Sequence, residues 1–423
     1  MFILGAALRV ALIGVNGYPG DISTFERWMQ ALATAGPSLF YADQGLMRYP
    51  PVDYVPGYPL ILWPVSALYV HIFGPIVPLS GFALAAFEKL PAIVADLVLA
   101  GLTYRLALRV VAPRMAALAS AAILFAPTFW LVSAVWGQVD SIAVVFVVAA
   151  MWCMLSGRST AAWIMLACAL LLKPQPLAVA PIFLMWELRR PHWLRHIGLA
   201  ALAAIVISYA VSLPFAPSKQ PGAVFSWLIS RYLFGYEKYP WVSFNAWNLY
   251  GVGSMNVSDA RHVLGVPLRA WGVLLTAALV FAIAARLWRA LVATAAPVAR
   301  ERWFLVASTA ALATPYMLAT RMHERYLLFA LAPASIVATF APELLAIVAA
   351  LTALFALNCA YVLFVLPTGA HPVWMRPLLH VPPLSEVALY VLLLAVFFTG
   401  RGFAAVRPLA SRPAGAETRA APA

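Results

Sequence analysis

Arg321-Met322-His323-Glu324-Arg325-Tyr326 is the densest cluster of charge in the chain, with four ionisable side chains within five residues. An apolar run over about 303–320 precedes it, and a second run over about 327–339 follows it. Apolar runs that approach the roughly 20 residues needed to cross a bilayer predict membrane helices. The charged cluster is therefore predicted to lie where two membrane helices meet water.

The composition predicts an all-α polytopic membrane protein. Hydrophobic residues make up 64% of the 423 residues and charged residues 10%, whereas soluble domains are roughly half apolar and a quarter charged. The net charge of +13 comes from basic residues scattered between apolar runs rather than gathered on one polar surface. This scatter indicates positive-inside topology, so we expect the lipid bilayer and not nucleic acid as a partner.

About twelve transmembrane helices are expected, and any number from ten to thirteen fits the runs. The apolar runs place them at about 1–16, 82–104, 115–134, 139–156, 160–173, 175–187, 196–214, 266–286, 303–319, 325–341, 343–366 and 385–400. Basic residues near the helix ends place both termini in the cytoplasm. We expect a single membrane domain over 1–400, with large extracytoplasmic loops at 16–80 and 215–265, and a disordered cytoplasmic tail at 401–423.

The first outer loop is predicted to contain an amphipathic helix that lies along the membrane surface. Its apolar residues recur at helical spacing, namely Ile22, Phe25, Trp28, Met29 and Leu32. Ser23 and Glu26 have the spacing of a capping box. That assignment leaves the Asp21 carboxylate available just above the first membrane helix, although a solvated loop residue or an N-cap is the alternative for Asp21.

Charged residues also occur at membrane depth, where each needs a partner or a function. Glu88, Lys89 and Asp96 lie in the predicted helix over 82–104, and Arg9 lies in the first helix. We expect a structural network of ion pairs here, with Arg9 as the partner of Glu88.

Several polar side chains are predicted to share the outer surface with Asp21. Asp53, Tyr54 and Tyr58 lie in a proline-rich turn, whose rings either stack on sugars or anchor the loop among lipid headgroups. Gln138 and Asp140 stand between two membrane helices, where Asp140 either serves a ligand or caps the following helix.

Lys173 lies at the tip of a predicted helical hairpin on the same surface. It is placed either to meet a lipid phosphate or only to extend its ammonium toward water.

The second outer loop combines aromatic rings with amides. Trp241, Asn245 and Asn248 belong to a stretch of nineteen residues, 232–250, that suits carbohydrate, because rings stack on sugar faces and amides bond to hydroxyls. A belt at the membrane interface would explain the rings equally well but would not explain the two amides.

Arg321, His323 and Arg325 offer guanidinium forks and an imidazole beside the start of a helix, which together suit a lipid phosphate. The alternative is a turn that sets membrane topology. This alternative conflicts with the positive-inside trend, because these basic residues lie on the outer side.

The chain resembles the GT-C membrane glycosyltransferases that use polyprenyl-phosphate sugars as donors. The resemblance is to the group that includes the GPI-anchor mannosyltransferases and the dolichyl-phosphate-glucose enzymes. It rests on Asp21, Tyr54-Val55-Pro56-Gly57-Tyr58, Trp136-Gly137-Gln138-Val139-Asp140, Lys173-Pro174-Gln175, Asn245-Ala246-Trp247-Asn248 and His323-Glu324-Arg325-Tyr326. The chain has Asp21-Ile22 where protein O-mannosyltransferases have an Asp-Glu pair, and it lacks the Trp-Trp-Asp motif of oligosaccharyltransferases.

The resemblance implies an extracytoplasmic active site, with Asp21 as the general base and His323 among the groups that hold the donor phosphate. The other groups expected at the phosphate are Arg321, Arg325 and Lys173. The sugars are expected to contact Asp53, Tyr54, Tyr58, Gln138, Asp140, Trp241, Asn245, Asn248 and Tyr326. No metal and no cofactor are expected.

The expected reaction moves a sugar, by family analogy mannose, from a polyprenyl phosphate to a glycan or glycolipid hydroxyl. One base and one displacement predict inversion at the anomeric carbon. The expected location is a bacterial plasma membrane.

A transporter or flippase of lipid-linked sugars is the alternative. It would need a second site that faces the cytoplasm, and the residues predicted on that side include almost no carboxylate or histidine to build one.

Overall fold

The computed structural model describes residues 1–41, 52–77, 81–253, 255, 257–368 and 380–400. The predicted cytoplasmic tail at 401–423 and part of the first outer loop lie outside these residues.

The described residues are mostly helical. The first half of the chain contains α1 (Phe2–Leu12), α2 (Pro19–Thr34), α3 (Gly36–Phe40), α4 (Gly57–Phe73), α5 (Phe82–Ala107), α6 (Pro113–Phe125), α7 (Pro127–Trp130), the π-helix η1 (Leu131–Val135), α8 (Asp140–Leu155), α9 (Ser159–Leu170), the 3₁₀-helix η2 (Gln175–Val179), α10 (Ala180–Glu187) and α11 (Trp193–Ser212).

The second half contains α12 (Pro221–Glu237), α13 (Leu268–Ala293), α14 (Pro297–Leu318), α15 (Leu328–Phe340), α16 (Pro342–Ala360), the π-helix η3 (Tyr361–Val365), the 3₁₀-helix η4 (Leu366–Thr368) and α17 (Val381–Thr399). Short strands form two pairs, β1 (Ser243–Phe244) with β4 (Met322–His323) in parallel, and β2 (His262–Val263) with β3 (Val266–Pro267) as an antiparallel hairpin.

Each of the twelve predicted helical ranges overlaps a helix of the structure. By length and composition, five helical stretches of the described residues are able to cross a membrane: Pro113–Val135, Trp193–Ser212, Leu268–Ala293, Pro342–Thr368 and Val381–Thr399. Shorter apolar helices, among them α8, α9 and α15, accompany them. The chain is an integral membrane protein, and the number of twelve spans stays a prediction.

The first predicted outer loop contains a helix that the sequence patterns did not predict. The prolines of residues 49–59 suggested a turn, but Pro56 is the N-cap of α4 and Pro59 lies in its first turn. A proline in the first turn removes no helical hydrogen bond, because the N–H groups there have no partner within the helix. Only Pro64 lies inside the helix. The α12 helix is likewise a helix that was not predicted, and it lies within the second predicted outer loop.

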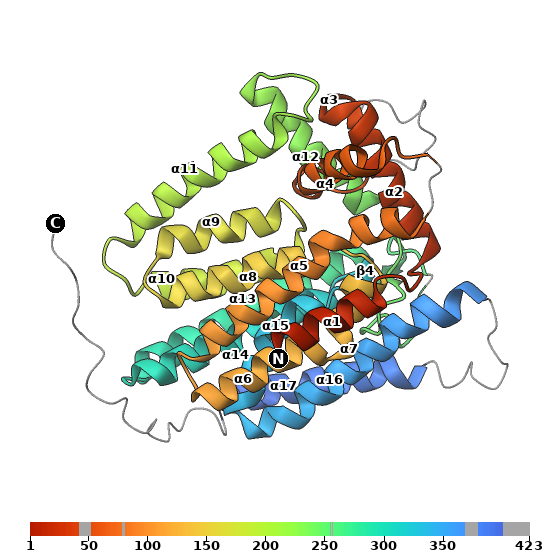
Figure 1. Cartoon of the computed structure of the whole chain (residues 1–423). Helices are drawn as coiled ribbons and strands as arrows, with labels where there is room; N and C mark the ends of the chain where they lie inside the picture. Colours follow the sequence, from red (N-terminus) through yellow and green to blue (C-terminus); the bar gives the residue numbers. More distant parts are fainter. Residues whose placement is uncertain (42–51, 78–80, 254, 256, 369–379, 401–423) are drawn as a thin grey trace.

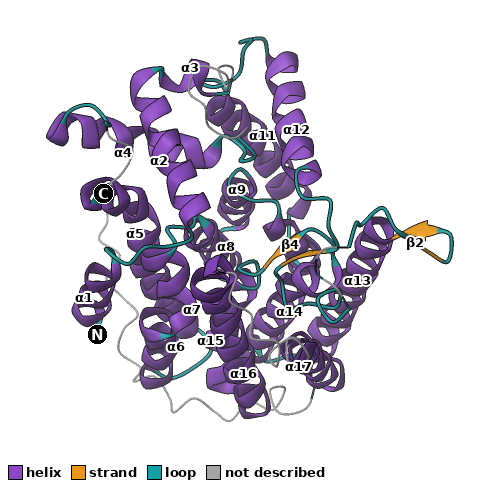
Figure 2. Cartoon of the chain, turned by 90° about the vertical axis from the view of Figure 1, so that its right-hand side faces the viewer, coloured by secondary structure: helices purple, strands orange, loops and turns teal. Residues whose placement is uncertain are grey.

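Helices from distant parts of the sequence pack side by side in one bundle, in which α14 and α15 are buried almost throughout. Helices that are apolar on all sides belong in the interior of such a bundle. The helices α2, α3, α4 and α12 gather at the upper right in Figure 1, and β4 lies below them at the right-hand end of the bundle. Figure 2 views the molecule from that end and shows β4 among the helix ends.

The charges within the bundle pair differently from the prediction. Arg9 binds Asp96, with its Nη2 2.7 Å from Oδ2, and both side chains are fully buried. The expected partner, Glu88, lies eight residues before Asp96 on α5, which is about 12 Å along a helix axis. Lys89 donates instead to the carbonyls of Ile13 and Val15, at 2.9 and 2.8 Å. Buried ion pairs of this kind hold α1 against α5.

Candidate functional site

A cavity of about 650 Å³ opens at the end of the bundle where α2 and α12 lie. Its walls come from α2, the segment around Tyr54, Trp136, the segment 172–175, α12 and the cluster 321–326. Ligand cavities typically measure about 300–1,000 Å³ and lie where several elements meet. Asp21 and the charged cluster are 300 residues apart in sequence and line the same cavity.

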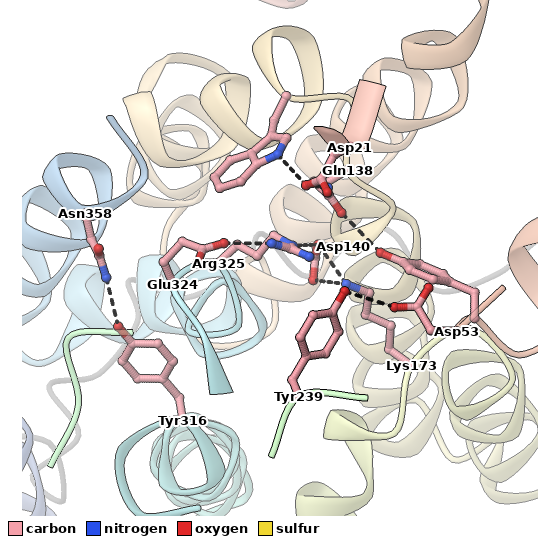
Figure 3. A network of polar contacts seen from close by, with 12 residues as sticks. Asp21, Asp53, Gln138, Asp140, Lys173, Tyr239, Tyr316, Glu324, Arg325 and Asn358 are labelled. Carbon is pink, nitrogen blue, oxygen red and sulfur yellow. Dashed lines mark hydrogen bonds and ion pairs between the residues drawn. The ribbon is translucent and has the colours of Figure 1, made fainter. Parts of the chain in front are cut away.

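Asp21 projects from the first turn of α2, and its Oδ2 is held by two donors. The indole Nε1 of Trp136 donates to it at 2.8 Å and the amide Nε2 of Gln138 at 2.7 Å (Figure 3). The Asp21 Oδ1 atom accepts no hydrogen bond from the described residues and belongs to a side chain that lines the cavity. One carboxylate oxygen is therefore fixed, and the other is available.

The local structure around Asp21 corrects one prediction. The α2 helix begins at Pro19, not after Ser23, and no side chain caps it. The Ser23 hydroxyl donates to the carbonyl of Gly20, and Glu26 is buried. The capping box does not form because a proline at the first helical position already begins the helix there.

Gln138 extends the support of Asp21 to a second wall of the cavity. While its Nε2 donates to Asp21, its Oε1 accepts from the hydroxyl of Tyr54 at 3.2 Å. Gln138 is completely buried and does not line the cavity itself. Its role in the described structure is therefore to link Tyr54 to the carboxylate, and not to contact a ligand.

The opposite wall is cationic. The Nη1 of Arg325 donates to Glu324 at 2.6 Å, and its Nε lies 3.5 Å from the Oδ2 of Asp140. Lys173 donates to both oxygens of Asp140, at 2.9 and 3.0 Å. Asp140 is fully buried and serves two cations that line the cavity (Figure 3). Burial lowers the pKa of Arg325. The negative charges of Glu324 and then Asp21 outweigh burial, so the pKa of Arg325 lies well above its usual value.

His323 is 5% exposed and is surrounded by aromatic rings. The rings of Tyr239, Phe244 and Tyr326 lie 4.7–5.1 Å from its imidazole, centroid to centroid. Its Nδ1 has no partner among the described residues. Burial, followed by the charges of Arg325 and other cations, lowers the pKa of His323 well below its usual range. His323 is therefore a neutral imidazole at pH 7.

Arg321 faces the same cavity but is already engaged. Its Nε donates to Asp259 Oδ2 at 2.5 Å, its Nη1 donates to the carbonyl of Tyr236 at 2.6 Å, and its guanidinium lies 4.0 Å from the centroid of the Tyr236 ring. Its backbone φ is +65°, which is uncommon outside glycine. The predicted phosphate contact therefore falls less naturally to Arg321 than to Arg325, because all three side-chain nitrogens of Arg321 donate to groups of the described chain, whereas Arg325 donates there from Nη1 alone.

The predicted sugar-contact residues divide into two groups. Asp53, Tyr54, Asn245 and Tyr326 line the cavity. Asp53 accepts from the hydroxyl of Tyr239 at 3.3 Å and pairs with Lys238 at 3.0 Å.

The other predicted sugar contacts lie outside the cavity lining, together with Gln138 and Asp140, which support lining residues. Tyr58 is buried against Phe25, and Trp241 packs on Tyr239. Asn248 is fully buried, and both ends of its amide are used within the chain. Its Oδ1 accepts from the backbone of Tyr250 and Gly251, and its Nδ2 donates to the carbonyl of Tyr316. Asn248 and Tyr58 therefore do not line the cavity, and their predicted sugar contacts stay predictions.

Three residues important to this cavity were not among the predicted site residues. Trp136 holds Asp21. The sequence contained a signal for this residue, because Trp136 begins the Trp136-Gly137-Gln138 segment that includes the predicted site residue Gln138. Glu324 pairs with Arg325 within the predicted cluster. Arg231 of α12 lines the cavity and lies over the rings of Tyr41 and Phe234, and no sequence pattern singled it out.

Among the described residues, no group of three or more His, Cys, Asp or Glu side chains is arranged to hold a metal ion. Asp53, Asp140 and Glu324 are instead paired with Lys238, Lys173 and Arg325, respectively.

Comparison with known proteins identifies the fold. No family model and no curated protein matches the chain. Among solved structures, ArnT from Cupriavidus metallidurans bound to undecaprenyl phosphate is similar, with a TM-score of 0.50 and 14% identity over 94% of this chain and 77% of that one. An oligosaccharyltransferase from Archaeoglobus fulgidus tethered with an acceptor peptide gives a TM-score of 0.45 and 13% identity, and this chain covers 55% of its length. The predicted fold is confirmed: the chain is an integral membrane protein with the GT-C fold.

Proposed function

We propose that this protein is a glycosyltransferase that moves a sugar from a polyprenyl phosphate to an acceptor hydroxyl, with inversion. The observation that carries the proposal is the cavity that Asp21 shares with the cations Arg325 and Lys173 and with the neutral imidazole of His323. An available carboxylate oxygen opposite cationic groups suits a reaction in which a proton leaves one side and a phosphate the other. The similar fold of ArnT bound to undecaprenyl phosphate supports the lipid donor.

In the proposed reaction, the acceptor oxygen attacks the anomeric carbon while Asp21 Oδ1 takes the acceptor proton. The bond between that carbon and the phosphate oxygen breaks, and its electron pair leaves with the polyprenyl phosphate. Arg325 and Lys173 stabilise the developing charge, and the neutral imidazole of His323 donates an N–H. Trp136 and Gln138 hold Asp21 in position. One displacement by one nucleophile inverts the anomeric configuration.

Arg321 has a supporting role in this proposal. It joins Asp259 to the carbonyl of Tyr236 and so fixes the end of α12 beside the phosphate wall. Mannose as the sugar, a glycan or glycolipid acceptor, and an extracytoplasmic site in a bacterial plasma membrane belong to the same proposal. They rest on the resemblance of the sequence segments and on the positive-inside pattern.

The test is transfer by the purified full chain in liposomes, with synthetic polyprenyl phosphates that carry mannose, glucose, galactose or arabinose. We expect one donor to release free polyprenyl phosphate and form a glycoside of opposite anomeric configuration. Movement of the intact lipid between leaflets, without any glycoside, would support the transporter alternative. A product that retains the donor configuration would contradict the single displacement.

A further inference from the structure

A second cavity, of about 450 Å³, lies on the other face of α2. The α2 residues that line it are Pro19, Ile22, Ser23 and Glu26, whereas those that line the first cavity are Gly20, Asp21, Thr24, Phe25 and Trp28. Residues three and four apart share a helix face, so the two sets point in different directions. The α2 helix therefore stands between two cavities.

The wall between the cavities is thin near Asp21. Gly17 lines the second cavity and the next residue, Tyr18, lines the first. A Cβ atom at Gly17 would lie only 2.6 Å from the carbonyl oxygen of Val135 and 3.0 Å from the Cα of Trp136. The backbone before α2 therefore lies directly against the segment that holds Asp21, and no side chain thickens the wall there.

The second cavity carries one available acceptor group and one partly available donor. Glu26 is only 6% exposed, and its carboxylate makes no hydrogen bond or ion pair with the described residues. Lys89 is 1% exposed and uses two of its three N–H bonds on the carbonyls of Ile13 and Val15. Buried polar groups in native proteins nearly always have partners. These two groups therefore point to a ligand that both donates and accepts hydrogen bonds.

The charge of the two cavities differs, and the difference selects the ligand class. Arg325, Lys173 and Arg231 line the first cavity, which suits an anion. In the second cavity the only lysine already has two partners, and the unpaired carboxylate of Glu26 repels a phosphate. A neutral molecule rich in hydroxyl groups satisfies both Glu26 and Lys89, because each hydroxyl is a donor and an acceptor.

We propose that the second cavity binds the sugar of the acceptor, with Glu26 accepting from one hydroxyl and Lys89 donating to another. Asp21 lies in the first turn of α2, the helix that forms one wall of this cavity. The assignment of this sugar as the acceptor rests on the proposed function. Binding of a neutral sugar beside Glu26 does not.

The experiment measures binding of methyl mannoside and methyl glucoside to the full chain in nanodiscs, by saturation-transfer difference NMR. Glu26→Gln removes the acceptor charge, and Ala85→Trp fills the cavity from its α5 wall. Matched controls are Glu343→Gln and Ala201→Trp, at exposed positions that line neither cavity. A thermal melt of each variant confirms that it folds.

We expect the wild type to bind one glycoside. Glu26→Gln should weaken this binding about 10- to 100-fold, as for loss of a hydrogen bond to a charged group. Ala85→Trp should abolish it. In the transfer assay both variants should raise the KM for the acceptor while the affinity for undecaprenyl phosphate stays unchanged. Equal glycoside binding by the wild type and both variants would overturn the proposal, as would no binding by the wild type. Glycoside binding that depends on Glu26, without transfer from any donor, would support the sugar site and contradict the proposed function.

Discussion

The indole of Trp136 donates a hydrogen bond of 2.8 Å to the carboxylate of Asp21 across 115 residues of sequence. The bond reaches Oδ2, which Gln138 also binds, so the two donors of one loop leave the other oxygen toward the cavity. A general base needs this combination of a fixed orientation and an available oxygen.

Replacement of Asp21 by Asn is expected to reduce turnover about 100- to 10,000-fold, the usual contribution of a general base. The amide keeps the shape of the side chain but does not take a proton. Transfer from the active polyprenyl donor measures the effect, and equilibrium binding of undecaprenyl phosphate should change little. Wild-type turnover in Asp21→Asn would exclude this residue as the base.

Arg325→Ala is expected to weaken binding of undecaprenyl phosphate about 10- to 100-fold, because a charged hydrogen-bond donor is lost. Equilibrium binding in nanodiscs provides the measurement. Arg195→Ala, on the exposed N-terminal part of α11, is the matched control and should bind normally. If Arg325→Ala also binds the lipid normally, the phosphate lies elsewhere.

The burial of His323 predicts acid sensitivity. Its pKa is lowered in the folded state, first by burial and then by neighbouring cations, so the unfolded chain takes up this proton first. Stability should therefore fall as the pH drops below about 6.5, the ordinary pKa of histidine. Melting temperatures of the wild type and His323→Gln between pH 7.5 and 5 measure the effect. The variant should lose less stability over this range, and parallel curves would contradict the prediction.

The ion pair of Arg9 and Asp96 predicts an asymmetric response to mutation. Arg9→Met leaves a buried carboxylate without its cation and should destabilise the protein by about 3–5 kcal/mol. The double variant Arg9→Met with Asp96→Leu removes both charges and should recover most of that loss. Thermal unfolding in detergent compares the two. A double variant no more stable than Arg9→Met would contradict this prediction.

Gly137→Ala is expected to disturb the loop that holds Asp21. Gly137 has a φ of +78°, and a Cβ atom there would lie 2.3 Å from the carboxylate of Glu88. The left-handed conformation alone costs a residue with a side chain roughly 1–2 kcal/mol. We expect a lower melting temperature together with slower transfer. Gly198→Ala is the control, since a Cβ atom there meets nothing within 4 Å.

The sequence was informative about the fold because membrane length and apolar character impose the helices. Proline positions were less informative: the prolines of residues 49–59 suggested a turn, whereas Pro56 and Pro59 occupy the start of α4. A proline pattern alone does not distinguish a helix start from a loop, because the same fixed φ serves both.

The sequence also predicted that Asp21 and the 321–326 cluster lie on one side of the membrane. In the structure, both groups line one cavity. It did not reveal which cations were already paired. Asp259 lies 62 residues before Arg321 in an irregular segment, and no periodic pattern connects the two. Asn248 illustrates the same difficulty, since an amide that binds backbone groups and one that binds a sugar look identical in sequence.

The carboxylate of Asp140, shared by Lys173 and Arg325, is a counterion built into the cavity wall. Without this carboxylate, the buried cations Lys173 and Arg325 would repel each other and would attract an anion from solution. With Asp140 between them, the charge of the two cations is balanced within the chain, so the shape of this wall does not depend on a bound anion. Under the proposed function, a lipid phosphate competes with Asp140 for Lys173 and Arg325, and both cations keep this carboxylate as a partner when the phosphate leaves.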